Sequence, residues 1–435
     1  AMRRSRKRMT DYRAVADAVM KRRALAEALF DAFVSLSRDP DAGVTRASYG
    51  EEENKIHAHV ASVAETLGLA VTRDAAANTY MTLGGRDPQA KRIVTGSHLD
   101  SVKQGGKVDG AAGVVAGLVA CAALTDLGVA PACDVSVMGV RAEESAWFGV
   151  SYIGSRAALG LLPDGALDAR RVDSDRSLAE HIRAAGGAPD AIAARRRHLD
   201  PARLRCFLEL HIEQGPLLDR DGIPVGIVTG IPGNFRFPEA RVVGEYGHVG
   251  QLRAWRRDAV VAASELACAL DALWEDWEAA QKPMAFTLGQ FMTDPALHAL
   301  TKVPGELRFT LDVRSTDAAL LAELEDKTRA IIGAIEQRRG VRFDLGKTAR
   351  AAVGHMDADI RARFEAIATS LAIPTRRLGS PASHDAAAFA AAGVPTAMLF
   401  VRNANGSHNP DEAMTIDDFL QATAVMTGWL ADAVA

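Results

Sequence analysis

The first half of the chain alternates between apolar runs of strand length and segments with helical spacing. Residues 52–67 carry apolar side chains at helical intervals, and residues 91–97 form a short apolar run that ends in polar residues. Small and apolar residues at 111–128 end at a glycine, which is typical of a helix terminus, and residues 133–140 alternate as a strand does. This order of strand, helix and strand predicts a βαβ unit in an α/β domain.

The pattern changes after about residue 232. A predicted strand at 205–212 and polar helical segments at 161–203 still belong to the first pattern. Residues 233–340 then predict strands and helices in β-α-β-β-α order, with long helices at 256–280 and 317–339. This order predicts a smaller α+β domain of ferredoxin-like type, inserted into the larger one. The larger domain is therefore expected to be discontinuous, at 10–232 and 341–435.

The composition is that of a soluble globular protein. The chain has 435 residues, which favours two domains, with 24% charged residues and a net charge of −4. This balance argues against nucleic acid as a partner, and no apolar run approaches the roughly 18 residues that span a membrane. The four cysteines lie far apart, which favours a reducing, cytoplasmic location. The basic run at 2–9 is expected to belong to a disordered tail over residues 1–9, because no apolar signal-peptide stretch follows it.

His98 and Asp100 stand two residues apart at the end of a predicted strand. Strand geometry points both side chains to the same side, which suits a histidine metal ligand oriented by a carboxylate. A loop histidine beside a capping aspartate is the alternative. Asp109 precedes the next predicted helix, where a carboxylate is favoured with or without a metal.

The pair Glu143 and Glu144 ends the next apolar strand, where one carboxylate can bind a metal while the other holds a water. A solvated loop explains this pair equally well. His211 ends the strand at 205–212, and His408 follows an apolar run at 396–401. Ligands at several strand ends converge on one crevice in open α/β folds. Together these residues predict a site for two divalent ions that share one carboxylate and keep open positions, the two sets being His98, Asp109, His211 and Asp109, Glu144, His408.

Several longer stretches resemble one family. They are "GSHLDSV" with "GGKVDG", "LELHIEQGP", "VPGELRFTLDVR", "SHDAAAFA" and "SHNPDE". In this order they resemble the amidase/hydantoinase-carbamoylase group of di-metal hydrolases, which includes N-carbamoyl-L-amino acid hydrolases, β-ureidopropionases and allantoate amidohydrolases and is related to the zinc aminoacylases and carboxypeptidases. The resemblance implies a di-zinc-peptidase-like catalytic domain, an inserted lid and dimerisation domain, and a homodimer. It also implies hydrolysis of an amide or ureido C–N bond in a small substrate that carries a carboxylate.

The resemblance also implies roles for single residues. Glu143 matches the family's general base, Asp100 stands beside it as a catalytic residue, and the metal ligands are the five named above. Arg314 is expected to pair with the substrate carboxylate, as a guanidinium does well. The other expected substrate contacts are Gln214, His248, Thr301 and His384.

Three departures from the family pattern surround the substrate rather than the metals. This chain reads "HVGQLRAW" where the family reads "HAGTTPM", Thr301 replaces an asparagine, and "FVRN" replaces "FVPS". The exact acid is therefore less defined than the reaction, although Arg402 and Asn403 of the last segment could add contacts.

Other functions remain open at this stage. A di-zinc dipeptidase or aminoacylase shares the metal ligands, and a metal-binding regulatory protein without turnover would share the fold. The chain has no G-x-S-x-G, G-x-G-x-x-G or P-loop motif, which disfavours serine hydrolases and nucleotide enzymes. Histidine and carboxylate ligands accept Zn²⁺, Mn²⁺, Co²⁺ or Ni²⁺, and Zn²⁺ is the first expectation.

Overall fold

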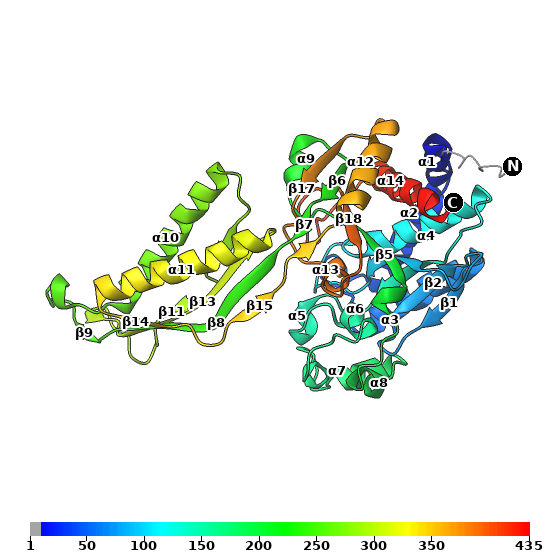
Figure 1. Ribbon diagram of the computed structural model, residues 1–435. Coiled ribbons are helices and arrows are strands. Elements are labelled where there is room, and N and C mark those ends of the chain that lie inside the picture. Colours follow the sequence, from blue (N-terminus) through cyan, green and yellow to red (C-terminus); the bar gives the residue numbers. More distant parts are fainter. Residues whose placement is uncertain (1–9) are drawn as a thin grey trace. The chain divides into compact units, whose positions relative to one another are not determined.

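The computed structural model describes residues 10–435, so the basic run at 2–9 lies outside the described residues (Figure 1). The chain divides into two compact units. The first unit comprises the chain up to Thr229 together with His355–Ala435, and the second comprises Gly230–Gly354. The fold is α/β, as predicted, and each unit has its own sheet.

An eight-stranded mixed sheet forms the centre of the first unit, in the order β1-β2-β4-β3-β5-β18-β6-β17. The four middle strands, β4, β3, β5 and β18, are parallel to one another. Strand β2 pairs antiparallel with β4 on one side of this group, and β6 pairs antiparallel with β18 on the other. The strands are β1 (Ala70–Arg73), β2 (Thr79–Leu83), β3 (Arg92–His98), β4 (Val135–Val140), β5 (Leu204–Ile212), β6 (Val225–Val228), β17 (Thr375–Leu378) and β18 (Thr396–Val401).

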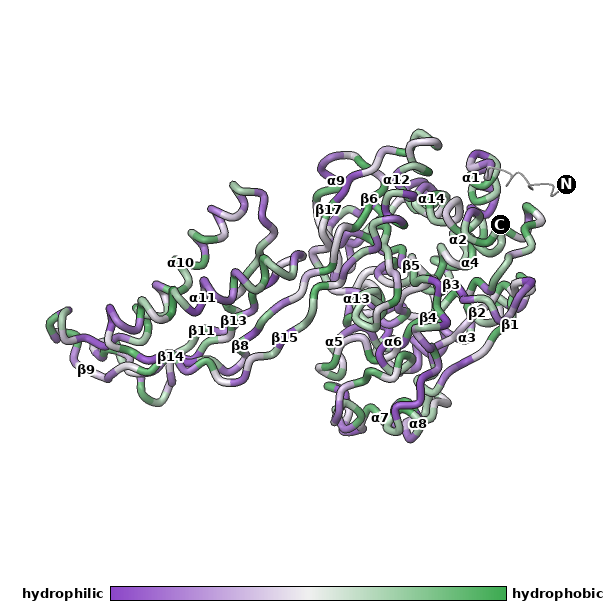
Figure 2. Tube along the Cα trace, viewed as in Figure 1, coloured by the Kyte–Doolittle hydropathy of each residue, from purple (hydrophilic) through white to green (hydrophobic). Residues whose placement is uncertain are grey.

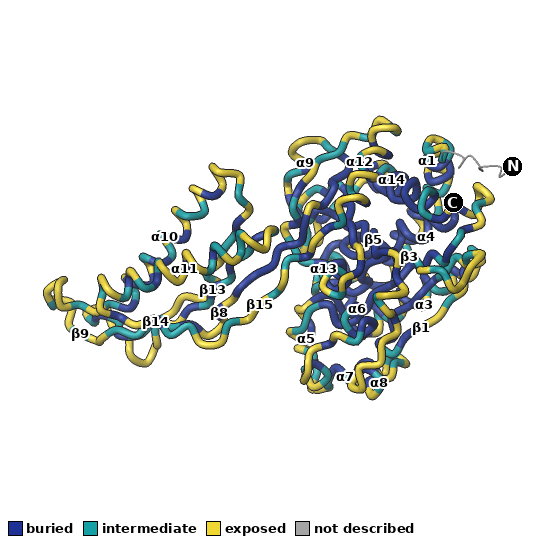
Figure 3. The backbone as a smooth tube through the Cα atoms, viewed as in Figure 1, coloured by how far each residue is buried: buried dark blue, intermediate teal, exposed yellow. Residues whose placement is uncertain are grey.

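Helix α4 (Ala111–Asp126) connects β3 to the parallel strand β4 and completes the predicted βαβ unit. Every residue from Ala111 to Leu124 is buried, because α4 packs on β3 on one side and on other helices on the other. A helix that is apolar all round belongs in such a position. Figure 3 shows the buried residues concentrated around α4, β3 and β5.

The remaining helices of the first unit cover the sheet. Helices α1, α2 and α14 pack against α4, and α13 packs against β5 and β18. Helices α1 and α2 are not among the elements that the sequence pattern predicts. The helices are α1 (Tyr12–Met20), α2 (Arg23–Ser37), α3 (Glu51–Thr66), α5 (Ser145–Phe148), α6 (Ile153–Ala158), α7 (Leu178–Ala184), α8 (Pro189–Ala193), α9 (Leu217–Asp221), α12 (Ala358–Ser370), α13 (Ala386–Ala391) and α14 (Ile416–Val434), with 3-10 turns η1 (Ala166–Asp168) and η2 (Pro201–Arg203).

The second unit is an antiparallel sheet with two long helices. Its strand order is β10-β13-β8-β14, with β11 paired to β13 and β15 paired to β8. Helices α10 (Ala259–Ala279) and α11 (Ala318–Arg339) contact each other and the sheet, and Figure 2 shows hydrophilic and hydrophobic residues alternating along both. The strands are β8 (Gly233–Val243), β9 (Gly247–His248), β10 (Ala285–Thr287), β11 (Phe291–Met292), β12 (Lys302–Val303), β13 (Glu306–Ser315), β14 (Arg342–Asp344) and β15 (Ala349–Ala351); η3 is Arg253–Trp255.

The second unit extends past residue 340, the boundary that the sequence pattern suggested. Strands β14 and β15 both pair with β8 and so complete the sheet of this unit. The short strands β7 (Gly230–Ile231) and β16 (Gly354–His355) lie where the chain passes between the units.

Residues 161–203 contain short helices and turns rather than long helices. All four cysteines are free, and three of them are buried. Within residues 10–435, no helix is long and apolar enough to cross a membrane.

Candidate metal centre

The expected metal ligands lie at the carboxyl ends of neighbouring strands in the first unit. His98 is the last residue of β3, and His211 lies one residue before the end of β5. Glu144 follows β4 and His408 follows β18. Because β4, β3, β5 and β18 are consecutive parallel strands, their carboxyl ends meet at one edge of the sheet. Asp109 stands at the same edge, in the loop between β3 and α4.

The two carboxylate oxygens of Asp109 face two different ligand sets. Its Oδ1 lies 3.2 Å from Nε2 of His211 and 3.7 Å from Nε2 of His98. Its Oδ2 lies 3.2 Å from Nε2 of His408, and that nitrogen is 3.3 Å from Oε1 of Glu144. Within each set the ligand atoms lie within 4.8 Å of one another. The structure therefore brings together all five residues, with Asp109 shared between the sets.

The ring orientations of two histidines suit metal binding. Nδ1 of His98 lies 3.0 Å from the backbone oxygen of Asp100, and Nδ1 of His211 lies 2.9 Å from the backbone oxygen of Ile212. Because a carbonyl oxygen only accepts, Nδ1 carries the hydrogen in both rings when they are neutral. Each Nε2 then presents its lone pair toward Asp109, which is the tautomer that a metal ligand needs.

The surroundings of Asp109 fit a cation. Its Oδ1 is buried and makes no hydrogen bond to any other residue in the part of the chain that the structure describes. Buried polar atoms are normally hydrogen-bonded, so a carboxylate oxygen that lies between imidazole nitrogens without a hydrogen bond fits metal coordination. Three histidines and two carboxylates are a donor set that Zn²⁺, Mn²⁺, Co²⁺ and Ni²⁺ all accept.

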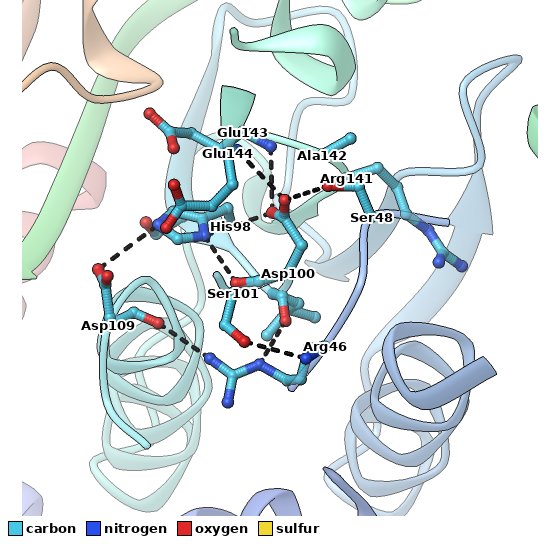
Figure 4. A network of polar contacts seen from close by, with 12 residues as sticks. Arg46, Ser48, His98, Asp100, Ser101, Asp109, Arg141, Ala142, Glu143 and Glu144 are labelled. Carbon is cyan, nitrogen blue, oxygen red and sulfur yellow. Dashed lines mark hydrogen bonds and ion pairs between the residues drawn. The ribbon is translucent and has the colours of Figure 1, made fainter. Parts of the chain in front are cut away.

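Asp100 ties the end of β3 to the loop after β4 (Figure 4). Its carboxylate accepts hydrogen bonds from the backbone N–H of Glu143 at 3.0 Å and of Glu144 at 3.2 Å. It also accepts from the hydroxyl of Ser48 at 2.6 Å, and its Oδ1 is 3.4 Å from Nδ1 of His98. One buried carboxylate thus fixes both the histidine ring and the backbone of the two glutamates.

Glu143 stands beside the metal ligands without belonging to the sets around Asp109. One of its oxygens lies within 4.8 Å of ligand atoms of His98 and Glu144. Burial raises the pKa of Glu143 well above its usual value, and Glu144 and Asp385 raise it further, although His98 lowers it. A carboxylate with a raised pKa accepts a proton readily near neutral pH.

Two of the expected substrate contacts lie beside this centre. Gln214 donates from Nε2 to Oδ2 of Asp109 at 3.2 Å, and its backbone adopts a positive φ of 62°. The ring of His384 is buried, with its centroid 4.4 Å from that of His211, and its Nε2 lies 2.9 Å from the hydroxyl of Ser380. Burial holds the pKa of His384 well below its usual value, so this ring is neutral.

The segment "FVRN" makes contacts within the protein. Arg402 donates from Nε to Asp418 on α14 at 2.9 Å, and Asn403 accepts at Oδ1 from the backbone N–H of Gln214 at 3.0 Å. Asn403 also donates to the backbone oxygen of Gly406 at 2.6 Å. Asn403 therefore holds Gln214, while the guanidinium of Arg402 is directed to α14.

Three further expected contacts belong to the second unit. His248 on β9 pairs with Lys302 on β12, and the N–H of Val249 donates to the backbone oxygen of Thr301 at 2.9 Å. His248 and Thr301 are therefore neighbours within this unit. Arg314 on β13 donates from Nε and Nη2 to the carboxylate of Asp312 at 2.9 and 3.1 Å.

Two further buried residues, for which the sequence pattern predicts no role, contact the backbone of Asp109. Arg46 donates to its carbonyl oxygen at 3.2 Å, and Glu412 accepts from its N–H at 3.1 Å. Glu412 lies inside the quoted stretch "SHNPDE", but Arg46 lies more than sixty positions before Asp109 in a stretch of mixed small residues. No periodicity of hydrophobic residues marks either position.

Comparisons with known proteins show which family the chain belongs to. The profile of peptidase family M20/M25/M40 matches residues 94–432. An N-carbamoyl-L-amino acid amidohydrolase of Geobacillus stearothermophilus is 34% identical over 391 residues, covering 88% of this chain and 91% of that protein. An allantoate amidohydrolase of Escherichia coli K12 is 31% identical over 405 residues, covering 90% and 93%. A hydantoinase/carbamoylase family amidase of Burkholderia ambifaria superimposes with a TM-score of 0.79 at 26% identity, covering 94% and 96%.

Proposed function

The chain belongs to peptidase family M20/M25/M40 and is an amidohydrolase, and we propose that it hydrolyses the ureido C–N bond of a small acid. N-carbamoyl-L-α-amino acids and allantoate-like ureido acids are the substrates we expect. The observation that carries this proposal is the shared carboxylate of Asp109, which faces two ligand sets beside the buried Glu143.

The residues around Asp109 would hold two divalent ions. His98 and His211 would complete one set, and Glu144 and His408 the other. Bound ions polarise a substrate carbonyl and lower the pKa of a bound water. Zn²⁺ is our first expectation, with Mn²⁺, Co²⁺ and Ni²⁺ as alternatives, because the donor set accepts each.

Glu143 would act as general base and then as general acid. Its position beside the ligands His98 and Glu144 would let it take a proton from the attacking water and return that proton to the leaving nitrogen. Asp100 would keep Glu143 in place through the backbone N–H bond, and burial of both carboxylates would keep bulk water from competing for the proton. The products would be the amino acid with carbon dioxide and ammonia, or the corresponding products of an allantoate-like acid.

Residues of both units would recognise the substrate. Gln214 and His384 lie beside the metal ligands and would contact the ureido group or the carboxylate. On the second unit, Arg314 would bind the substrate carboxylate, with Asp312 holding the plane of its guanidinium by two hydrogen bonds. His248 and Thr301 would supply further contacts when this unit acts as a lid.

The second unit would also carry the contact between two copies of the chain. Most of the large hydrophobic residues that are exposed belong to this smaller unit. Exposed apolar residues that gather into a patch mark interaction surfaces, and those of this unit are the candidates we propose. These residues are Tyr246, Val249, Leu252, Trp255, Val261, Phe291, Met292, Leu297 and Leu300.

A substrate panel tests the proposed reaction. N-carbamoyl-L-amino acids, allantoate, N-acetyl amino acids and dipeptides are incubated with protein loaded with each metal, and ammonia and free amino acid are measured. We expect the highest kcat/KM for a ureido acid. A higher kcat/KM for acetylated amino acids or dipeptides would instead establish an aminoacylase or dipeptidase.

A further inference from the structure

Glu412 connects the two loops that carry Asp109 and His408. Its carboxylate is buried, and Oε1 accepts hydrogen bonds from the backbone N–H groups of Val108 at 3.0 Å and Asp109 at 3.1 Å. Its Oε2 accepts from the hydroxyl of Ser407 at 2.6 Å. Ser407 also lies 3.1 Å from Oδ2 of Asp109. A single carboxylate therefore holds the shared ligand by its backbone N–H.

Gly106 leaves the space that Glu412 fills. A Cβ atom at Gly106 would lie 2.0 Å from Cδ of Glu412, and the three atoms nearest to it all belong to that carboxylate. Gly106 is not among the glycines with a positive φ. An alanine here would therefore meet the Glu412 carboxylate without straining its own backbone.

Arg46 also contacts the backbone of Asp109 (Figure 4). The side chain is completely buried, and it donates from Nε to the backbone oxygen of Leu99 at 2.7 Å and from Nη2 to that of Asp109 at 3.2 Å. Its own N–H donates to the hydroxyl of Ser101 at 3.0 Å. A buried guanidinium is costly unless it is compensated, and here the negative charges of Asp109 and Glu412 favour its charged form.

We propose that Arg46 and Glu412 are positioning residues, which hold the backbone of Asp109 at its C=O and at its N–H and thereby aim its two oxygens at the two ligand sets. The N–H of Asp109 meets a carboxylate and its C=O meets a guanidinium, so both backbone bonds are charge-assisted. Only the side-chain torsions of Asp109 are then left to define where its oxygens lie. This inference rests on the proposed function in that Asp109 is taken as the shared metal ligand.

Metal affinity of the metal-free protein tests the proposal without any substrate. Zn²⁺ is titrated calorimetrically into wild type and variants, and folding of each is checked by near-UV circular dichroism. Glu412→Ala and Glu412→Gln both remove the charge, but only the amide oxygen of glutamine can still accept from the two N–H groups. Outer contacts of metal ligands contribute about 10–100-fold to affinity, so we expect Glu412→Gln to bind at least about tenfold more tightly than Glu412→Ala. The exposed neighbour Asp411, changed to Asn, is the control and should leave the affinity unchanged.

Two further variants separate positioning from charge. Removing the positive charge with Arg46→Met would by itself strengthen cation binding, whereas loss of positioning weakens it, and we expect weaker binding. Gly106→Ala changes no charge and should weaken binding about tenfold or more in wild type. In the Glu412→Ala background the same substitution should cost little, because the carboxylate that its Cβ would meet is gone.

Several results would overturn the proposal. These are equal affinities for Glu412→Gln and Glu412→Ala, tighter binding by Arg46→Met, or equal effects of Gly106→Ala in the two backgrounds. A wild-type protein that binds no Zn²⁺ would overturn it together with the metal centre. Two bound ions with no hydrolysis of any ureido acid would overturn the proposed function alone. If Glu412→Ala does not fold, Gly106→Ala and Arg46→Met decide the matter.

Discussion

Gly110 lies against the imidazole ring of His98, so closely that a Cβ atom at position 110 would be 2.5 Å from three ring atoms. The glycine also has a positive φ of 66°. Gly110→Ala is therefore expected to displace His98 and to weaken metal binding by about tenfold or more, in addition to a loss of stability.

Gly128 provides a matched control for this substitution. It has a φ of 65° just beyond the other end of α4, and no atom lies within 4 Å of a Cβ there. Gly128→Ala should lower the melting temperature through the same backbone strain but leave the Zn²⁺ affinity unchanged. Equal losses of affinity in both variants would show that contact with His98 is not the cause.

We expect Arg314 to give the enzyme its preference for substrates that carry a carboxylate. A lost charge-assisted hydrogen bond costs roughly 1.5–3 kcal/mol, so kcat/KM should fall at least about tenfold when the substrate acid is replaced by its amide. In Arg314→Ala this preference should disappear. Arg308 lies on the same strand with an exposed side chain, and Arg308→Ala is the control. Equal kcat/KM values for acid and amide in wild type would argue against carboxylate recognition by Arg314.

Trp255 should contribute to the contact between two copies of the chain. It is 71% exposed in the second unit, and Val172 is 73% exposed in the first. Sedimentation should find a wild-type dimer that Trp255→Ser weakens, because burying an aromatic residue contributes strongly to an interface. Val172→Ser should leave the dimer intact. A monomeric wild type, or a dimer unaffected by Trp255→Ser, would contradict this expectation.

Glu325 should make the stability of the second unit depend on pH. Hydrogen bonds from Arg350 on β15 and from Arg329 lower the pKa of Glu325 to about 2, so its ionised form is favoured in the folded state. This stabilisation is complete above the unfolded pKa of about 4.5 and is lost as the pH falls through 2. Since Arg350 is largely exposed, Glu325→Gln should lower the unfolding free energy by about 1–2 kcal/mol at pH 7.

The pH dependence of this difference is the informative measurement. Urea unfolding at several pH values should show the gap between wild type and Glu325→Gln closing between pH 4.5 and 2. A gap that stays constant over this range would mean that the ion pair does not fasten β15 to α11 in solution.

The convergence of four expected metal ligands could be predicted because each stands near the end of an apolar strand in the sequence. His98, Glu144, His211 and His408 stand at or beyond strand ends, and parallel strands bring such positions to one edge. The boundary of the second unit was harder to place, because β14 and β15 are only three residues long and their pairing with β8 leaves no periodic signal.

The residues that hold the centre together could not be predicted in the same way. Arg46 and Glu412 contact backbone groups of Asp109, and such contacts depend on loop conformation rather than on a residue pattern. The departure of Arg402 from the family pattern suggests a substrate contact, whereas in the structure its guanidinium binds Asp418. This contact depends on the packing of α14 against β18, which the sequence pattern does not predict.

The central claim is that Glu143 moves the proton in ureido hydrolysis at the centre around Asp109. The most direct measurement is ammonia release from an N-carbamoyl-L-amino acid or from allantoate by wild type and Glu143→Gln, with the bound metal of both quantified. We expect equal metal content and a kcat that is lower by about 10²–10⁴ in the variant, which is the usual contribution of acid–base catalysis. Near-normal turnover by metal-loaded Glu143→Gln would contradict the account.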